Sequence, residues 1–115
     1  MYLGIDLGTS ELKLVLLSPR RRIEASARSP LSISRPQPVW SEQQPEDWWR
    51  ALEDAMAQLA LSHPDAMRAV RGIGLSGQMH GAVLLDVADA VLRPAILWND
   101  GRSASQCRAL MRDVP

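Results

Sequence analysis

The sequence has a single cysteine, Cys107, among 115 residues, so no disulfide can form within the chain. A lone thiol is typical of proteins from a reducing compartment. No apolar run approaches the ~20 residues that a membrane-spanning helix needs. The opening residues, MYLGID, include an acid and lack the basic segment of a secretory signal or transit peptide. We therefore expect a cytoplasmic protein that has no membrane partner.

An excess of charge of either sign is also missing, because 13 basic residues balance 13 acidic residues. Such a chain has no net field that would draw it to nucleic acid, and no nucleic-acid partner is expected. Internal repeats and low-complexity segments are absent as well. The length suits one domain with a single core.

Apolar patterning predicts an α/β domain with a mixed sheet. Strands are expected at residues 2–7, 12–17, 22–29, 70–75, 82–86 and 95–98, the first three as a meander. Helices are expected at residues 45–61 and 103–112. Pro45 suits the first position of the longer helix, whose buried stripe is Trp48, Leu52, Ala55, Met56 and Leu59. A stretch with four prolines, residues 29–45, is expected to be irregular.

Three polar motifs each follow an apolar strand, and the first is DLGTS. In open α/β sheets, ligands bind beyond the carboxyl ends of strands. Glycine and hydroxyl residues in a tight turn can surround phosphate oxygens, and Asp6 could hold a Mg²⁺ ion between itself and a nucleotide. The phosphate contacts would come from Gly8, Thr9, Ser10 and Lys13. The alternative is an ordinary hairpin turn that uses these residues because turns favour them.

The second motif is SGQMHG, in which Gln78 and His80 carry hydrogen-bonding groups and Met79 is an apolar neighbour, a combination that suits a small polyhydroxylated molecule. Its alternative is a neutral histidine held in a turn. The third motif is LWNDGR, in which Trp98 offers a flat apolar face to a sugar and Asn99 and Asp100 offer partners for hydroxyls. Its alternative is a strand end with a turn rich in Asn and Asp before a helix.

Together these stretches resemble the N-terminal part of the FGGY family of carbohydrate kinases. The resemblance rests on GIDLGTSELKLVLL, RPQPVWSEQQPEDWW, GIGLSGQMHGAVLLD and LRPAILWNDGR, which occur in the family's order and cover most of the chain. It implies a ribonuclease-H-like, actin-like ATPase fold: a mixed β-sheet with flanking helices, here as an incomplete N-terminal domain over residues 1–115. It is most similar to members that use Mg-ATP to phosphorylate D-xylulose, which gives D-xylulose 5-phosphate.

The resemblance also implies roles for individual residues. Asp6 would act in metal and phosphate handling, and Thr9, Ser10 and Lys13 would line the phosphate turn. The sugar contacts would be Met79, His80, Trp98, Asn99 and Asp100. Glu11 departs from the small residue of many relatives, so its side chain must point away from the turn. The family's general base lies further along than Pro115, so we expect the isolated chain to be inactive.

Other interpretations stay open at this point. A related kinase of the family could act on ribulose, fuculose or gluconate. An actin-like or heat-shock-protein-like ATPase would need only DLGTS and would leave the other two motifs unexplained. A non-enzymatic interaction domain is a third possibility. The oligomeric state of the complete enzyme, a homodimer among the options, is not determined by the sequence.

Overall fold

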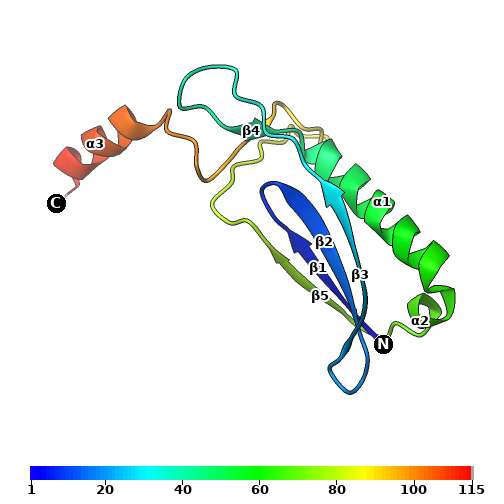
Figure 1. The fold of residues 1–115 in the computed structure, drawn as a ribbon. Coiled ribbons are helices and arrows are strands. Elements are labelled where there is room, and N and C mark those ends of the chain that lie inside the picture. The colour runs from blue at the N-terminus through cyan, green and yellow to red at the C-terminus, as the bar shows by residue number, and fades with distance from the viewer. Residues whose placement is uncertain (115) are drawn as a thin grey trace.

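The structure, a computed structural model, describes residues 1–114 and contains a four-stranded mixed sheet (Figure 1). The strand order is β3-β2-β1-β5. β2 pairs antiparallel with both β1 and β3, whereas β5 pairs with β1 in parallel. The strands are β1 (Tyr2–Leu7), β2 (Glu11–Leu17), β3 (Ile23–Pro30) and β5 (Ile73–Gly77). The predicted meander and the mixed sheet are therefore confirmed.

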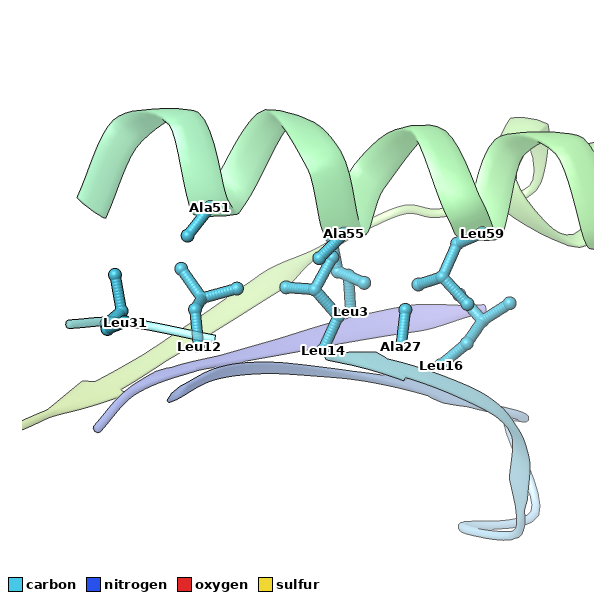
Figure 2. Packing of buried hydrophobic residues seen from close by; sticks show 9 residues of the cluster. All are labelled: Leu3, Leu12, Leu14, Leu16, Ala27, Leu31, Ala51, Ala55 and Leu59. Atoms are coloured by element: carbon cyan, nitrogen blue, oxygen red, sulfur yellow. The ribbon is translucent and has the colours of Figure 1, made fainter. Parts of the chain in front are cut away.

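One face of this sheet is covered by helix α1 (Pro45–Ser62), and the core lies between them (Figure 2). On β2 the buried leucines alternate with partly exposed residues, which is the pattern of a strand with one covered face. Each buried leucine stabilises the fold by roughly 1.5–3 kcal/mol. The buried core residues are Leu3, Leu12, Leu14, Leu16, Ala27, Leu31, Ala51, Ala55 and Leu59.

The predicted helix is confirmed, with Pro45 in its first turn, but its buried stripe is centred differently from the prediction. Ala51, Ala55 and Leu59 are the buried residues, and the two alanines let the helix approach the sheet closely. Trp48, Leu52 and Met56 pack at the edge of this core and are only partly buried. No helix within residues 1–114 has the length and apolarity to cross a membrane.

Pro64 follows the end of α1 and begins a second short helix, α2 (Pro64–Arg68), which the sequence analysis did not expect. The strand expected at residues 70–75 starts later, at Ile73, because α2 and its C-cap Ala69 occupy the preceding residues and the Val70 amide still donates to the Met67 carbonyl.

Two strand predictions at the far end are wrong in extent. Residues 82–86 form only isolated bridges, Ala82 with Ile96 and Leu85 with Val91, because this exposed loop has no layer to pack against. The strand expected at residues 95–98 shortens to β6 (Ala95–Ile96). It pairs with β4 (Glu42–Gln43), a strand inside the stretch that was expected to be irregular. Helix α3 (Ala104–Asp113) agrees with prediction and extends away from the sheet (Figure 1).

Candidate functional site

The first two motifs meet because β1 and β5 are parallel neighbours. Asp6 lies opposite Ser76 and Leu7 lies opposite Gly77 in the register of the two strands. The Gln78 amide then donates to the Leu7 carbonyl over 2.7 Å. The turn after β1 and the loop after β5 therefore leave the same edge of the sheet side by side.

The third motif joins them at a cleft of about 380 Å³. This volume is in the range of small-molecule sites, ~300–1,000 Å³. The residues that line the cleft are Asp6, Gly8, Thr9, Gly77, Gln78, Met79, His80 and Trp98. All three polar motifs thus contribute to one concave surface, although they are widely separated in the sequence.

Hydrogen bonds between side chains connect the motifs behind the cleft. The Trp98 indole N–H donates to the Thr9 hydroxyl over 3.0 Å, and that hydroxyl donates to Gln78 Oε1 over 3.0 Å. Gln78 Nε2 donates to Gln43 Oε1, again over 3.0 Å. Gln43 Nε2 donates to the Thr9 carbonyl over 2.7 Å. The relative positions of the three motifs are therefore fixed by direct contacts.

The turn between β1 and β2 is tight enough to require glycine. A Cβ atom on Gly8 would lie 2.9 Å from the Glu11 carbonyl oxygen, to which the Gly8 amide donates. The Glu11 side chain points away from the cleft and pairs with Arg28 on β3, with 3.1 Å between Oε1 and Nη1. The glutamate that departs from the family pattern thus leaves the turn open.

Asp6 is exposed and lies on the sheet face opposite α1, where it is directly across from Lys13 in the β1–β2 register. Both residues line a second hollow of about 270 Å³, with Gly4 and Gly74 forming part of its floor. Asp6 also lines the cleft, so it stands where the two spaces adjoin. No group of three or more potential metal ligands occurs among residues 1–114. One exposed carboxylate is nevertheless compatible with Mg²⁺, which takes most of its ligands from water and phosphate.

His80 has a backbone φ of 63°, in the left-handed region that residues other than glycine seldom adopt. Such strain is more frequent at binding and catalytic sites than elsewhere. Here it turns the chain immediately after Met79, so that both side chains line the cleft.

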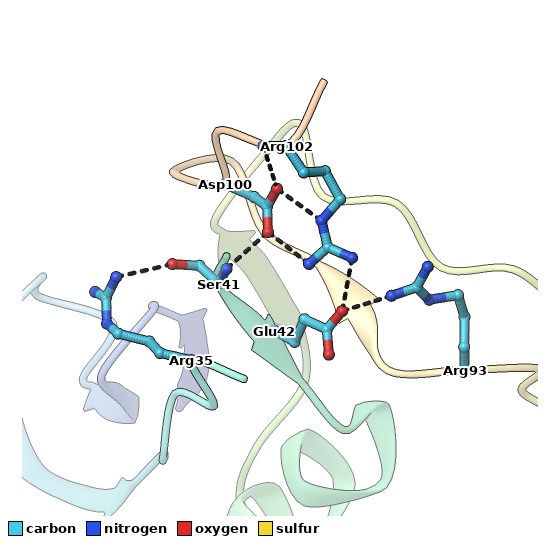
Figure 3. A network of polar contacts seen from close by, with 6 residues as sticks. All are labelled: Arg35, Ser41, Glu42, Arg93, Asp100 and Arg102. Carbon is cyan, nitrogen blue, oxygen red and sulfur yellow. Dashed lines mark hydrogen bonds and ion pairs between the residues drawn. The ribbon is translucent and has the colours of Figure 1, made fainter. Parts of the chain in front are cut away.

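Asp100 is not among the residues that line the cleft. Its carboxylate faces Ser41 and Arg102 (Figure 3). Its side chain is 1% exposed, accepts the Ser41 amide over 2.7 Å, and lies 2.6 Å from Arg102 Nη2. Hydrogen bonding to Arg102 holds the pKa of this carboxyl well below its usual range, in spite of burial. Asp100 also accepts the Arg102 amide over 2.9 Å, which is the turn that the alternative interpretation of LWNDGR described.

The same network includes Glu42, whose carboxylate pairs with Arg93 and Arg102 (Figure 3). Arg102 Nη1 lies 2.8 Å from Glu42 Oε1, an ion-pair distance without hydrogen-bond geometry. The Arg102 guanidinium also stacks 3.7 Å from the centre of the Trp40 ring. These contacts join the loop before α1 to the turn after Trp98.

The remaining predicted residues lie at the margins. Ser10 and Asn99 are exposed and do not line the cleft. Lys13 reaches the adjoining hollow instead. The sequence singled out Gln78 as a hydrogen-bonding residue for a ligand, whereas its side-chain amide bonds to Thr9 and Gln43. The sequence analysis missed Gln43 and Glu42. Glu42 and Gln43 lie in the WSEQ segment, where no hydrophobic periodicity and no motif spacing distinguishes them from other polar residues.

Comparisons with known proteins agree on one family. The whole chain, residues 1–115, matches the model of the FGGY family of carbohydrate kinases, N-terminal domain. Xylulose kinases from Klebsiella pneumoniae and Escherichia coli are 56% and 51% identical to it over 96% and 100% of the chain. The chain spans only 22% and 23% of their lengths.

Solved structures show the same fold. The crystal structure of a xyloylose kinase from Brucella ovis has a TM-score of 0.94 at 50% identity, over 97% of this chain and 23% of that one. A gluconate kinase from Lactobacillus acidophilus is 22% identical, with a TM-score of 0.89 over 97% of this chain and 22% of that one, and supports the fold alone. The predicted actin-like fold, as an incomplete N-terminal domain, is confirmed.

Proposed function

This chain belongs to the FGGY family of carbohydrate kinases, and from that membership we propose that the complete protein transfers the γ-phosphate of ATP to D-xylulose. The product would be D-xylulose 5-phosphate. Support for this substrate comes from the relatives that are more than half identical and are named xylulose kinases. We further propose that residues 1–115 form the N-terminal part of a two-domain enzyme that works in the cytoplasm.

One observation carries the proposal: motifs from three separate strand ends line a single cleft. A phosphoryl-transfer enzyme must hold donor and acceptor in line, and much of its rate acceleration comes from that positioning. An ATPase that needs only the DLGTS turn gives no reason for the other two motifs to face the same space. Their convergence therefore favours a two-substrate enzyme over a nucleotide-driven switch or a non-enzymatic domain.

On the phosphate side, we assign Asp6, Gly8, Thr9, Ser10 and Lys13. Gly8 lets a phosphate approach the backbone closely, because no side chain covers the turn. Lys13, across from Asp6, supplies a positive charge to the adjoining hollow. Asp6 would hold Mg²⁺, which when bound neutralises charge on the phosphate oxygens.

On the sugar side, we assign Met79, His80 and Trp98, which share the cleft with Thr9. The Trp98 ring supplies a flat apolar face, and His80 supplies a hydrogen-bonding group. Asn99 stays a proposed contact from the exposed turn beside Trp98. Asp100 is held by Ser41 and Arg102, so we assign it a positioning role in place of the predicted sugar contact.

The proton of the attacking hydroxyl has no assigned acceptor in this chain. General-base catalysis typically contributes 10²–10⁴-fold, so its absence alone would leave little activity. We therefore propose that residues 1–115 in isolation do not phosphorylate sugar, and that the base belongs to the remainder of the complete enzyme.

The test is a substrate panel for the complete protein. D-xylulose, ribulose, fuculose and gluconate are each supplied with Mg-ATP, and sugar-dependent ADP release is measured. We expect D-xylulose to have the highest kcat/KM. A higher value for another sugar would move the protein to a different specificity within the family. ATP hydrolysis that no sugar accelerates would overturn the kinase assignment.

A further inference from the structure

We propose that Gln43 is a positioning residue that holds the phosphate turn and the sugar-binding loop in one arrangement. This inference rests on the function proposed above. Gln43 is 2% exposed and lies on β4, outside all three motifs. Its amide contacts two residues of the cleft lining, Thr9 and Gln78, and one residue of α1, Trp48.

The orientation of the Gln43 amide is determined by its partners. The Thr9 carbonyl can only accept, so the atom 2.7 Å from it must be Nε2. The Trp48 indole can only donate, so the atom 2.9 Å from it must be Oε1. A flipped amide would place two acceptors together at the Thr9 carbonyl and two donors together at the Trp48 indole. Gln43 therefore has one satisfied orientation.

That orientation is transmitted to the cleft. Because Gln43 Oε1 must accept, the Gln78 atom that faces it is Nε2, and Gln78 Oε1 faces Thr9. The Thr9 hydroxyl must then donate to Gln78, and its oxygen accepts the Trp98 indole N–H. The hydroxyl hydrogen of Thr9 is thus already used. In this arrangement Thr9 can offer a phosphate its backbone N–H, and its hydroxyl oxygen can accept from a ligand donor.

The local fold explains how Gln43 reaches this position. Successive side chains of a strand point to opposite sides. On β4, Glu42 points to Arg93 and Arg102, whereas Gln43 points to Thr9 and Gln78. Pairing of Gln43 with Ala95 on β6 fixes its backbone. A two-residue strand thereby joins the ion-pair network to the hydrogen-bonded chain behind the cleft.

Two substitutions remove this function in different ways. Gln43→Met has a similar length and removes all three hydrogen bonds. Gln43→Glu keeps an acceptor for Gln78 and Trp48 but loses the donor to the Thr9 carbonyl. Gln58→Met is the matched control, because Gln58 Nε2 donates over 3.1 Å to the Arg28 carbonyl, away from the cleft.

The first readout is steady-state kinetics of the complete protein with D-xylulose and Mg-ATP. We expect kcat to fall about 10²-fold in both Gln43 variants, with a smaller change in KM, because small misplacements of reacting groups cost about that much. Gln58→Met should stay within about twofold of the wild type. Agreement between the neutral and the charged variant excludes an effect of added charge alone.

The second readout is the indole ¹⁵N–¹H resonance of Trp98, assigned with Trp98→Phe. Gln43 does not contact Trp98, so a shift must pass through Thr9. We expect this resonance to move in Gln43→Glu and Gln43→Met, and the Trp49 indole, which bonds to Glu53, to stay in place.

An unmoved Trp98 resonance, or a kcat equal to that of Gln58→Met, would overturn the inference. Should Gln43→Met fail to fold, Gln43→Asn replaces it as the neutral variant, because its amide is one methylene too short to reach Thr9 and Gln78 together. If the wild type phosphorylates no sugar, the proposed function fails, but the Trp98 resonance still decides the role of Gln43.

Discussion

The indole N–H of Trp98 donates a 3.0 Å hydrogen bond to the hydroxyl of Thr9, a residue 89 positions earlier in the chain. Thr9 belongs to the proposed phosphate turn and Trp98 to the proposed sugar motif. The two substrate sides of the cleft therefore share a direct contact, and a change on one side has a path to the other.

Trp98→Phe tests this contact, because it keeps an aromatic ring and removes the N–H. A net hydrogen bond is worth about 1 kcal/mol, so we expect kcat/KM for D-xylulose to fall about fivefold. Trp49→Phe is the control, since the Trp49 indole donates over 3.1 Å to Glu53 on the exposed side of α1. Equal kinetics in the two variants would show that the Trp98 hydrogen bond has no part in catalysis.

The strands and the motifs that follow them can be predicted from rules that are local in sequence, as the alternating leucines of β2 show. The meeting of DLGTS and SGQMHG at one edge of the sheet could not, because it depends on the parallel pairing of β1 with β5, which lie far apart in the sequence. Asp100 was ambiguous, because a carboxylate in a turn before a helix looks the same whether it binds a ligand or Arg102. Gln43 could not be found, since a polar side chain on a two-residue strand is buried only through contacts distant in sequence.

Asp6→Asn should lower kcat by at least about 10²-fold while leaving the KM for D-xylulose nearly unchanged. The reason is that an electrostatic group acting in the transition state typically contributes this much. The Mg²⁺ concentration for half-maximal rate should rise as well. Glu24→Gln, which neutralises an exposed carboxylate on β3, is the control. Unchanged turnover in Asp6→Asn would remove Asp6 from the phosphate site.

Substitutions of His80 separate its side chain from its backbone. All three of His80→Ala, His80→Asn and His80→Gly lose the imidazole, so we expect each to raise the KM for D-xylulose about tenfold. The left-handed φ of 63° costs most residues roughly 1–2 kcal/mol but costs glycine nothing and asparagine little. Thermal denaturation should therefore rank Gly and Asn above Ala. Loss of ATP binding with retained sugar binding would mean that His80 serves the nucleotide.

Asp100→Asn tests the positioning role of the network behind Trp98. It removes one of the two carboxylates that pair with Arg102 and leaves Arg102 with Glu42 alone. Breaking a buried ion pair typically costs 3–5 kcal/mol when the remaining charge has no partner, so we expect the lower end of that range, about 3 kcal/mol. Asp86→Asn is the control, because Asp86 accepts two backbone amides, those of Ala88 and Ala90, in an exposed loop without an arginine partner.

The pH dependence of this effect has a defined sign. Because the pKa of Asp100 is lowered in the folded state, its contribution to stability is fully present at neutral pH. It is lost only as the pH falls below about 4, the ordinary carboxyl pKa, toward the lower folded value. Denaturant unfolding of the wild type and of Asp100→Asn should therefore give free energies of unfolding that differ by a constant amount from pH 5 to 7, on the order of 3 kcal/mol. The difference should become smaller in acid. A stability difference that grows as the pH falls would contradict the ion pair, because protonation of the Asp100 carboxylate should weaken its contact with Arg102.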